Sequence, residues 1–325
     1  MVDAPAPTLL AVDGNSLAHR AFHASDPDER RGAWMLGLFV RILAGVWSYG
    51  PYHGVLVGFD HPVNHRKLAD AGYKAGRSEK DPALEEGLDE LPGLMARLGF
   101  TIEQHEGAEA DDVMASAASG AVALGARCHV LSSDKDLLAL VSDEVTLLRP
   151  RGTMGDLVVT DPARVRADHG VDPSQYVDLA ALRGDPSDGL RGVHGIGART
   201  AAKLLRRHRS VEQLYANLHH LDPRMEAKLR AGRDEVDRNL ALMTPLTGVP
   251  ADVAGTLQHG VDLDVVDEAL VALGEGRAAG TFRNAVTRPA PPPMPPPPDE
   301  APHEPVVVRA RPIEPSSATT QDALF

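Results

Sequence analysis

The first half of the chain alternates short apolar runs with longer segments of helical pattern. TLLAVD at 8–13 and GVLVGFD at 54–60 are apolar runs that each end in aspartate, and RCHVLS at 127–132 reads as a third strand, closely followed by Asp134 and Asp136. Runs of this length are typical of strands that are buried on both faces of a sheet. Two further short strands are predicted at 145–149 and 157–160.

Helices are predicted between these strands. Residues 34–49 have helical length and apolar content, a second helix covers 82–98, and an Ala-rich helix follows Glu109 and ends at Gly125. Acids in the first turn and a glycine after the last turn are common helix boundaries. Strands that alternate with helices imply an α/β fold, with a mainly parallel, doubly wound sheet flanked by helices.

The second half has a different pattern. Residues 176–287 give no strand signals and read as helices separated by Gly-rich or Pro-containing turns. From Pro289 to Pro315, twelve of 27 residues are proline, which prevents packing into a core. We therefore expect an α/β domain over 1–175, a helical region over 176–287 and a disordered Pro-rich tail over 288–325.

Composition limits the location and the partners. With 43% hydrophobic and 24% charged residues among 325, the chain is expected to be globular, and no apolar run is long enough to cross a membrane. The single cysteine, Cys128, excludes an intramolecular disulfide, and the N-terminus lacks a signal-peptide pattern, so a cytoplasmic protein is expected. The net charge of −13 argues against nucleic acid unless metal ions offset clustered carboxylates.

Acidic residues gather where the predicted strands end and where the Ala-rich helix begins. They are Asp13, Asp60, Glu109, Asp111, Asp112, Asp134 and Asp136. The carboxyl ends of parallel strands meet at one edge of an open α/β sheet, where ligands bind. Carboxylates this close repel one another, and a hard divalent cation relieves the repulsion. One aspartate at a strand end is often only a helix N-cap, but seven acids at one edge predict a metal site.

A second acidic block precedes a glycine-rich turn. In GDPSDGLRGVHGIG, Asp185 and Asp188 come before a G-x-x-G-x-G run that leads into a helix from Ala198. Backbone N–H groups at such a turn and at a helix N-terminus can bind phosphate. An ordinary tight connection between helices is the alternative, and the adjacent aspartates favour the phosphate interpretation.

Six sequence blocks, in this order, resemble the bacterial 5′–3′ exonuclease and flap endonuclease family, which includes the amino-terminal nuclease domain of DNA polymerase I. The blocks are LLAVDGNSLAHRAF, GVLVGFD, the segment from Arg66 to Arg77, GAEADD, SSDKDL and GDPSDGLRGVHGIGARTAAKLL. The resemblance implies a PIN-like (Rossmann-like) nuclease domain and a duplex-binding helix–turn–helix (H3TH) at about 190–208. No polymerase segment follows the blocks, so a stand-alone relative is expected.

The resemblance also implies a phosphodiesterase with two Mg²⁺ or Mn²⁺ ions in its active site. It assigns to the first ion Asp13, Asp60, Glu109 and Asp111, to the second Asp134, Asp136 and Asp185, and to supporting contacts Asp112 and Asp188. Two such ions, about 3.5–4 Å apart, can activate a water molecule and stabilise a leaving oxygen.

The basic segment within 61–98 resembles the family's arch or gateway. By this resemblance Lys74 and Arg77 are the catalytic cations that contact the scissile phosphate, and Arg66 is a further DNA contact. Tyr73 either stacks on a base, a contact that tolerates any sequence, or packs the arch against the protein. A solvated loop is the alternative for the whole segment.

The helix–turn–helix unit is expected to hold the duplex backbone without reading bases. The residues assigned to DNA binding there are Gly195, Gly197, Arg199, Thr200 and Lys203, with Arg206 and Arg207 as further cations. Relatives often bind a K⁺ ion at this turn, so K⁺ is a second expected cofactor.

Several departures from the family pattern concern the handling of the 5′ end. Gly189 and Arg191 stand where relatives usually have Asn and Pro, and His19 stands where Tyr is common. The loop at 23–34 lacks a typical Thr/Ser-Gly-Pro stretch. No departure removes a predicted metal ligand, so activity is expected to survive.

The last residues resemble a peptide that docks on the replication sliding clamp. Gln321, Leu324 and Phe325 end a Pro-rich tether, as in bacterial replication proteins that bind the clamp. Two apolar side chains would fill a pocket while the tether raises the local concentration at DNA. A frayed terminus is the alternative.

The expected function is that of a monomeric, structure-specific 5′–3′ exonuclease and 5′-flap endonuclease in replication and repair. Its expected substrates are DNA with 5′ flaps, nicks or gaps, and RNA primers. A DNA-junction scaffold with weak or no nuclease activity is the alternative, which the complete set of acids disfavours. A small ribonuclease of the related toxin class is also disfavoured, because those proteins lack the arch and the 176–250 region.

Overall fold

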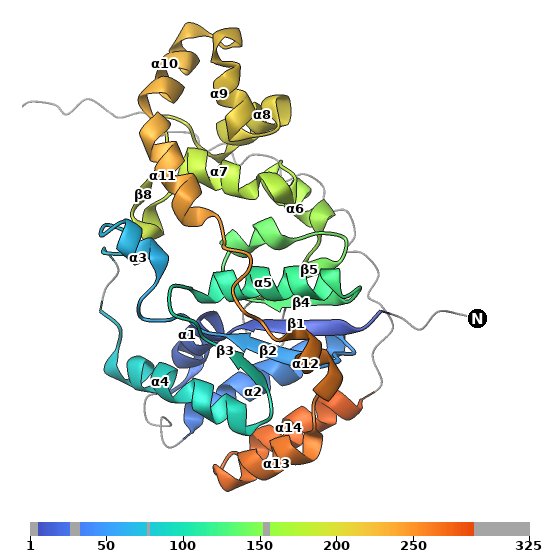
Figure 1. The fold of residues 1–325 in the computed structure, drawn as a ribbon. Coiled ribbons are helices and arrows are strands. Elements are labelled where there is room, and N and C mark those ends of the chain that lie inside the picture. The colour runs from blue at the N-terminus through green and yellow to red at the C-terminus, as the bar shows by residue number, and fades with distance from the viewer. Residues whose placement is uncertain (1–5, 27–32, 77–78, 152–156, 289–325) are drawn as a thin grey trace, which may run out of the picture. The chain divides into compact units, whose positions relative to one another are not determined.

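A six-stranded sheet lies at the centre of the protein (Figure 1). The computed structural model describes residues 6–26, 33–76, 79–151 and 157–288. The strands are β1 (Thr8–Asp13), β2 (Gly54–Gly58), β3 (Thr101–Glu103), β4 (Arg127–Leu131), β5 (Val145–Pro150) and β6 (Leu157–Thr160), in the order β3-β2-β1-β4-β5-β6. The first five strands are parallel, and β6 pairs antiparallel with β5 at one edge. The sheet is therefore mainly parallel, as predicted.

Both faces of the sheet are buried, which explains why the strand sequences are continuously apolar. In β1, Leu9 and Ala11 belong to one apolar core, whereas Leu10 and Val12 belong to the other, and all four are fully buried. Val12 pairs with Leu131 of β4, and β2 is paired on the other side of β1. The carboxyl ends of these three strands therefore meet at the same edge.

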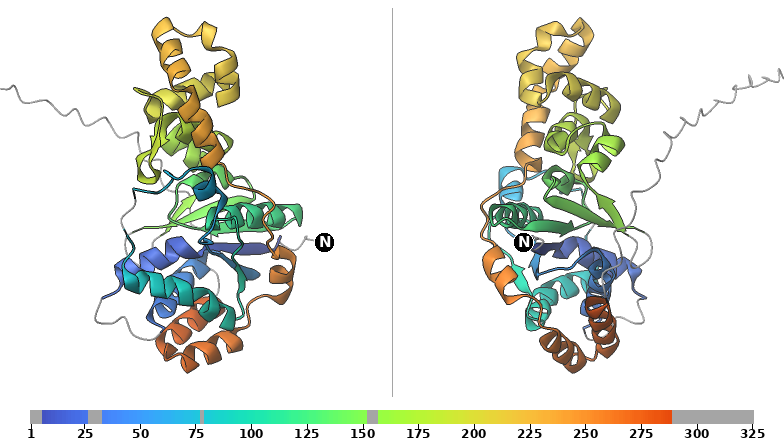
Figure 2. Two further views of the ribbon diagram at one scale, coloured as in Figure 1. Left: turned by 60° about the vertical axis from the view of Figure 1, so that its left-hand side comes forward. Right: turned by 90° about the vertical axis from the view of Figure 1, so that its right-hand side faces the viewer.

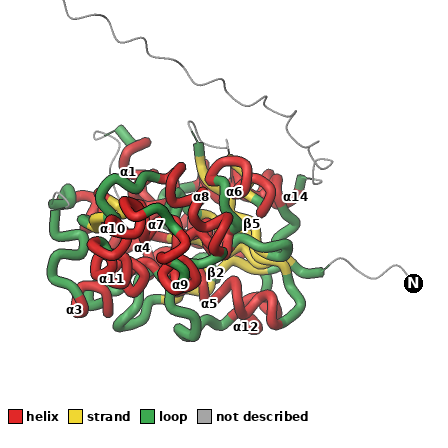
Figure 3. The backbone as a smooth tube through the Cα atoms, turned by 90° about the horizontal axis from the view of Figure 1, so that it is seen from above, coloured by secondary structure: helices red, strands yellow, loops and turns green. Residues whose placement is uncertain are grey.

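Helices cover both faces (Figures 1 and 3). One face packs against α5 (Ala110–Ala123) and α12 (Val253–His259). The other packs against α1 (Gly14–Ala24), α2 (Trp34–Val46), α4 (Pro82–Arg97), α13 (Leu263–Ala272) and α14 (Gly276–Thr287). The short helix α3 (His65–Ala69) lies in the predicted arch segment, and no described helix is both long and apolar enough to cross a membrane.

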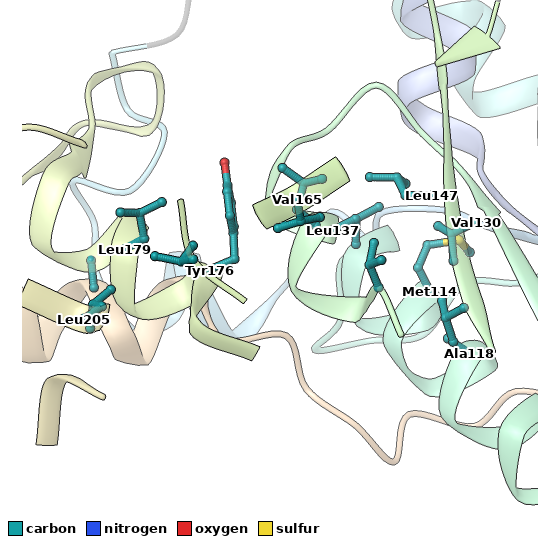
Figure 4. Packing of buried hydrophobic residues seen from close by; sticks show 14 of the residues in the cluster. Met114, Ala118, Val130, Leu137, Leu147, Val165, Tyr176, Leu179 and Leu205 are labelled. Carbon is teal, nitrogen blue, oxygen red and sulfur yellow. The ribbon is translucent and has the colours of Figure 1, made fainter. Parts of the chain in front are cut away.

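The helical second half shares the core that contains α5. Its first helices are α7 (Tyr176–Arg183), α8 (Ala198–His208), α9 (Val211–Ala216), α10 (Pro223–Ala231) and α11 (Arg233–Met243), and α6 (Pro162–His169) lies just before it in the chain (Figure 2). Tyr176 and Leu179 of α7 belong to the same buried cluster as Leu137, Val130 and Met114 (Figure 4). The described residues all belong to one compact unit.

A two-stranded hairpin interrupts these helices. It consists of β7 (Gly184–Asp185) and β8 (Leu190–Arg191), and it was not predicted, because two-residue strands carry no periodic signal. Gly184 has φ +79°, and a side chain there would lie 2.3 Å from the backbone nitrogen of Gly192. Short 3₁₀ helices lie at Trp47–Tyr49, Asp136–Leu140, Pro173–Gln175, Pro186–Asp188 and Leu218–His220.

The connection from α11 to α12, residues 244–252, is here called the strap. Side chains from the α/β half bind its backbone. Asp112 accepts a hydrogen bond from the Leu246 N–H at 2.7 Å, and Ser116 Oγ accepts from Gly248 and Val249, each at 3.1 Å. At its far end Glu103 of β3 accepts from Asp252 at 2.8 Å. The strap therefore fastens the helical half to α5 and β3 (Figure 1).

The predicted fold class is confirmed: a mainly parallel sheet flanked by helices, followed by a helical region. The predicted helix at 34–49 ends earlier, at Val46, and continues as one 3₁₀ turn. The Pro-rich tail from residue 289 and the predicted catalytic Arg77 lie outside the described residues.

Candidate active site

A cavity of about 990 Å³ opens at the carboxyl edge of the sheet, between α1 and the β7–β8 hairpin. Six of the nine predicted acids line it: Asp13, Asp60, Asp111, Asp134, Asp136 and Asp185. They come from five separate segments of the chain, so the parallel topology brings them together. The structure thus gathers these side chains, and their role as metal ligands stays a prediction.

Local backbone geometry holds the acids at the strand ends. Asp13 closes β1 and caps α1, accepting a hydrogen bond from the Ser16 N–H at 2.9 Å. Its other oxygen accepts from Ser132 Oγ at 2.6 Å, which ties the ends of β1 and β4 together. Asp60 accepts from the Ala110 N–H at 2.8 Å, so the residue after β2 also positions the start of α5.

The acids after β4 and in the hairpin sit in tight turns. Ser132 Oγ accepts from the Asp134 N–H at 2.9 Å, and Asp134 accepts from the Asp136 N–H at 2.9 Å. Asp185 accepts from both the backbone nitrogen and the hydroxyl of Ser187, at 2.9 and 2.6 Å. These short bonds position the side chains with few flexible torsions.

The carboxylates in this cavity repel one another when they are ionised. Burial raises the pKa of Asp13 to about 7, and the nearby Asp60 and Asp134 raise it further. Burial together with Asp134 and Asp185 raises the pKa of Asp136 to about 7. The pKa of Asp111 is also well above its usual value, because of burial and the charges of Asp134 and Asp13. A divalent cation would relieve this conflict, since it favours the ionised carboxylates.

The donor set fits a hard cation. Within the described residues, no three His, Cys, Asp or Glu side chains already form a group able to hold one ion. The acids instead line the cavity wall separately, and each offers carboxylate oxygens. Mg²⁺ commonly binds proteins through one or two carboxylates and keeps several of its waters, so spaced carboxylates of this kind suit it.

Replacing Asp111 with Asn is expected to stabilise the metal-free protein. Because its folded pKa is raised, the ionised Asp111 opposes folding at pH 8, where the unfolded chain carries the charge at little cost. A gain of about 1 kcal/mol would raise the melting temperature by about 2 °C in a chain of this size. Melting in EDTA at pH 8 measures this; a lower melting temperature for Asp111→Asn would contradict the repulsion. The same comparison at pH 4 should show a smaller gain in melting temperature. At that pH, near the pKa of the carboxyl in the unfolded chain, Asp111 is protonated in the folded protein and opposes folding little.

Asp112 is held by groups of the protein itself. It is fully buried, and its oxygens accept hydrogen bonds from Arg66 at 2.8 Å, from the Glu109 N–H at 2.9 Å and from the Leu246 N–H. Although burial acts to raise it, Arg66 holds the pKa of Asp112 below its usual value. The predicted supporting metal contact of Asp112, direct or through water, stays a prediction, and Arg66 supplies the cation that this structure places beside it.

Glu109 is likewise occupied by protein cations. Its side chain is 3% exposed, and it accepts hydrogen bonds from Arg66 at 2.9 Å, Lys74 at 2.9 Å and the Tyr73 hydroxyl at 3.2 Å. Among the described residues, Glu109 is not part of the cavity wall, and neither is the buried Asp188. Glu109, Asp112 and Asp188 are therefore absent from the described cavity wall, although the charge of Asp188 contributes to the raised pKa of Asp136.

The structure buries Arg66, which disfavours its predicted DNA contact. Its side chain is 2% exposed, and besides Asp112 and Glu109 it donates to the Leu242 carbonyl at 2.7 Å. A guanidinium enclosed by two carboxylates and a carbonyl has no surface for a phosphate. Arg66 instead fastens α3 to the start of α5 and the end of α11.

The two neighbours in the arch segment differ in exposure. Tyr73 is 7% exposed and packs with Leu190 and Leu242, so the structure favours the packing alternative over base stacking. Lys74 lines the cavity, with a side chain that is 17% exposed and paired with Glu109. Lys74 is the predicted catalytic residue that the structure does place at the cavity.

The predicted duplex-binding turn lies on the helical half. Gly195 has φ +75°, Gly197 is the N-cap of α8, and Arg199 and Lys203 are exposed one turn apart. The opposite side of α8 is buried through residues such as Ala201 and Leu205. Thr200 is partly buried in the first turn. The exposed cations therefore form one face, as the prediction requires, and their DNA contacts stay a prediction.

Several basic residues at the cavity were missed from the sequence. They are Arg20, His23, Lys135 and Arg183, and the noted departure His19 joins them. Three of these residues lie on α1, after Asp13. His19 and Arg20 come three and four residues after Ser16, and His23 comes four residues after His19 and three after Arg20. That spacing places them on the same helix face, and it could have identified them.

Fold and site together define an α/β protein with a carboxylate cavity at the edge of a mostly parallel sheet. Two family models match consecutive parts of the chain: the N-terminal resolvase-like domain of 5′–3′ exonucleases over residues 8–170, and their C-terminal SAM fold over 171–260. The chain therefore belongs to the 5′–3′ exonuclease family.

Known proteins agree with this assignment. DNA polymerase I of Mycobacterium leprae is 36% identical over 251 residues, which are 75% of this chain and 27% of that protein. The T5 D15 protein co-crystallised with metal ions has a TM-score of 0.63 at 19% identity, over 86% of this chain and 99% of that one. The T5 D15 flap endonuclease in a complex with DNA and metal ions has a TM-score of 0.60 at 21% identity, over 86% and 100%. The chain thus spans only about a quarter of the polymerase relative, and the two structures show likeness of fold.

Proposed function

We propose that this protein is a structure-specific 5′–3′ exonuclease and 5′-flap endonuclease that hydrolyses DNA phosphodiester bonds with two divalent metal ions. The observation that carries the proposal is the cavity wall of six carboxylates, together with an exposed basic face on α8. Family membership supplies the reaction class. The resemblance of fold to a flap endonuclease with DNA and metal ions supports the choice of substrate.

The carboxylates divide into two groups that would hold the ions. Asp13, Asp60 and Asp111 adjoin β1, β2 and α5, while Asp134, Asp136 and Asp185 lie after β4 and in the hairpin. When bound, such ions supply an activated water and stabilise the leaving oxygen. We propose Mg²⁺ or Mn²⁺ because every donor in the set is a hard oxygen.

The other cavity residues would orient the substrate. Lys74 and Arg183 approach the cavity from the arch segment and from α7, where they can hold the oxygens of a phosphodiester. Lys74 donates to Glu109 at 2.9 Å, and its ammonium has further N–H groups that can donate to a phosphate. Arg199 and Lys203 on α8 would grip the duplex backbone at a distance from the chemistry, which selects structure rather than sequence.

The finer assignments rest on the family and on the sequence. We propose action in replication and repair on flaps, nicks, gaps and RNA primers, by a monomer in the cytoplasm, with K⁺ at the Gly195 turn. Lys74 and Arg77 are proposed as the cations at the scissile phosphate.

Cleavage of a 5′-end-labelled flap duplex tests the proposed function. With Mg²⁺, release of the flap near its junction is expected, whereas a blunt duplex of the same sequence should be cut far more slowly. EDTA should abolish both reactions. A protein that binds the flap duplex but never cuts it with Mg²⁺ or Mn²⁺ would be a scaffold, and the proposal would fail.

Removal of residues 321–325 is expected to abolish binding to the sliding clamp while leaving flap cleavage unchanged. The proposed contacts are Gln321, Leu324 and Phe325, which lie outside the described residues. Losing two apolar anchors should weaken binding at least about 100-fold. Titration of purified clamp with the full and shortened chains measures this, and equal affinities would refute the docking proposal.

A further inference from the structure

Residues 70–74 follow α3 in the arch segment and are called the Lys74 turn below. The turn runs from Asp70, which ends α3, to Lys74, whose side chain lines the carboxylate cavity. Lys74 has φ +57°, and among the described non-glycine residues only Arg209 also has a positive φ. A lysine keeps this left-handed conformation only where neighbouring groups hold it. The contacts of the turn therefore decide whether the Lys74 ammonium reaches the cavity.

Two of these contacts come from the β7–β8 hairpin, which lies beside α3 (Figure 1). The Lys74 N–H donates to the Asp188 carbonyl at 3.1 Å. Gly189 has φ +74°, and a side chain there would lie 3.3 Å from the carbonyl oxygen of Gly72. A residue that departs from the family pattern thus lies against the backbone of the turn. The hairpin therefore supports the middle and the end of the Lys74 turn.

The start of the turn is held by α11. One oxygen of the Asp70 carboxylate accepts a hydrogen bond from Arg238 Nε, and the other accepts from the Gly72 N–H at 2.7 Å. The Asp70 carbonyl also accepts from the Tyr73 N–H at 3.1 Å. The hydrogen bond from Arg238 lowers the pKa of Asp70, so the pair is charged at neutral pH. Asp70 therefore joins α11 to the backbone that leads to Lys74.

The pair of Arg238 and Asp70 differs from its neighbour on the same helix. Arg233 pairs with Asp237 at 2.6 Å within α11, whereas Arg238 pairs with a residue 168 positions away. The side chains of Arg238 and Asp70 are 36% and 21% exposed. A pair this exposed adds little to the stability of the whole protein. Its effect is therefore expected to be local, on the conformation of the Lys74 turn.

We propose that Arg238 is a positioning residue for Lys74: through Asp70 it holds the Lys74 turn in the conformation that brings the ammonium to the carboxylate cavity. This inference rests on the proposed function, because it takes Lys74 as a cation at the scissile phosphate. Arg238 does not belong to the described cavity wall, so it acts through the turn. The helical half of the protein then sets the position of a group in the active site.

Single-turnover cleavage of the labelled flap duplex with Mg²⁺ tests this role. Arg238→Ala and Asp70→Ala should each lower the cleavage rate by about 10-fold, because a displaced Lys74 loses its alignment with the reacting phosphate. The double variant should be no slower than either single variant, because the two side chains act through one contact. The control Arg233→Ala removes the same charge from the same helix and should cut at the unmodified rate. A loss of rate for Arg238→Ala but not for Asp70→Ala would overturn the proposal, because Arg238 would then act on DNA directly.

A chain without the Lys74 ammonium separates positioning from a general loss of structure. In Lys74→Ala, the further change Arg238→Ala should leave the residual cleavage rate unchanged, because the group that Arg238 positions is absent. A further loss of about 10-fold in this background would overturn the proposal. In the unmodified background, Arg238→Lys should be faster than Arg238→Ala, because an ammonium can still donate to Asp70.

A chemical measurement tests the position of Lys74 without nuclease activity. Acetylation by acetic anhydride, followed by mass spectrometry, reports how often the Lys74 ammonium leaves Glu109, which lies 2.9 Å away. Arg238→Ala and Asp70→Ala should raise the acetylation rate of Lys74 several-fold, and Arg233→Ala should not. Equal rates in all of these proteins would overturn the proposal. If even the unmodified chain does not cut flap DNA, but the acetylation rates differ as expected, the proposed function fails while the positioning of Lys74 stands.

Discussion

Asp134→Ala is expected to reduce flap cleavage by roughly 10³-fold or more in the presence of Mg²⁺. Asp134 lines the carboxylate cavity, and its charge contributes to the raised pKa values of Asp13, Asp111 and Asp136. Its charge therefore acts on three other carboxyl groups of the site that would hold the ions. Loss of about 4 kcal/mol of transition-state stabilisation corresponds to this rate change. Single-turnover cleavage of the end-labelled flap duplex measures it.

A matched aspartate distinguishes this effect from a general change in charge. Asp143 is exposed in the loop before β5 and does not belong to the described cavity wall. Asp143→Ala should therefore cut at the unmodified rate. Binding of Mn²⁺ followed by its paramagnetic signal should be weakened by Asp134→Ala alone. If both variants cleave equally, the carboxylate cavity is not the catalytic site.

Arg66→Ala is expected to lower the free energy of unfolding by about 3–5 kcal/mol. The substitution leaves Asp112, which is fully buried, and Glu109, which is 3% exposed, without their shared cation. The Leu242 carbonyl loses a donor at the same time. A buried charge without a partner costs far more than a lost surface pair. Urea denaturation measures the change.

Two further variants test the explanation. Arg97 is exposed near the end of α4, and Arg97→Ala should change stability by less than about 0.5 kcal/mol. Arg66→Lys should recover only part of the loss, because an ammonium cannot reproduce the paired bonds of the guanidinium to Asp112 at 2.8 Å. A loss below about 1 kcal/mol for Arg66→Ala would show that water enters and solvates the carboxylates.

The sheet and most of its acids could be predicted from the sequence. Apolar runs such as 8–13 and 54–60 identify strands buried on both faces, and parallel topology then brings their ends to one edge. Those rules fix where Asp13 and Asp60 must lie before any packing is known. The same rules say nothing about which acids already have a cation within the protein.

The start of α5 shows this limit. Glu109, Asp111 and Asp112 are adjacent in sequence, yet Asp111 faces the cavity while Asp112 faces Arg66. Arg66 is 46 residues away in the chain, so local sequence cannot reveal the pair. Closely spaced acids do need a cation nearby. For Glu109 and Asp112 the protein supplies it in the guanidinium of Arg66. For Tyr73, burial depends on packing against Leu190 and Leu242, which are still more distant along the chain.

The strap bears on how members of this family can exchange parts. The two family models meet between residues 170 and 171, which suggests a seam at which halves could be swapped. However, Asp112 and Ser116 of the first half bind the backbone of Leu246, Gly248 and Val249 in the second. A chimera that joins the halves of two family members at this seam must take the strap and α5 from the same protein. Otherwise the buried Asp112 carboxylate loses the N–H group that donates to it. The unit that must be exchanged as a whole is therefore larger than the domain that either family model covers.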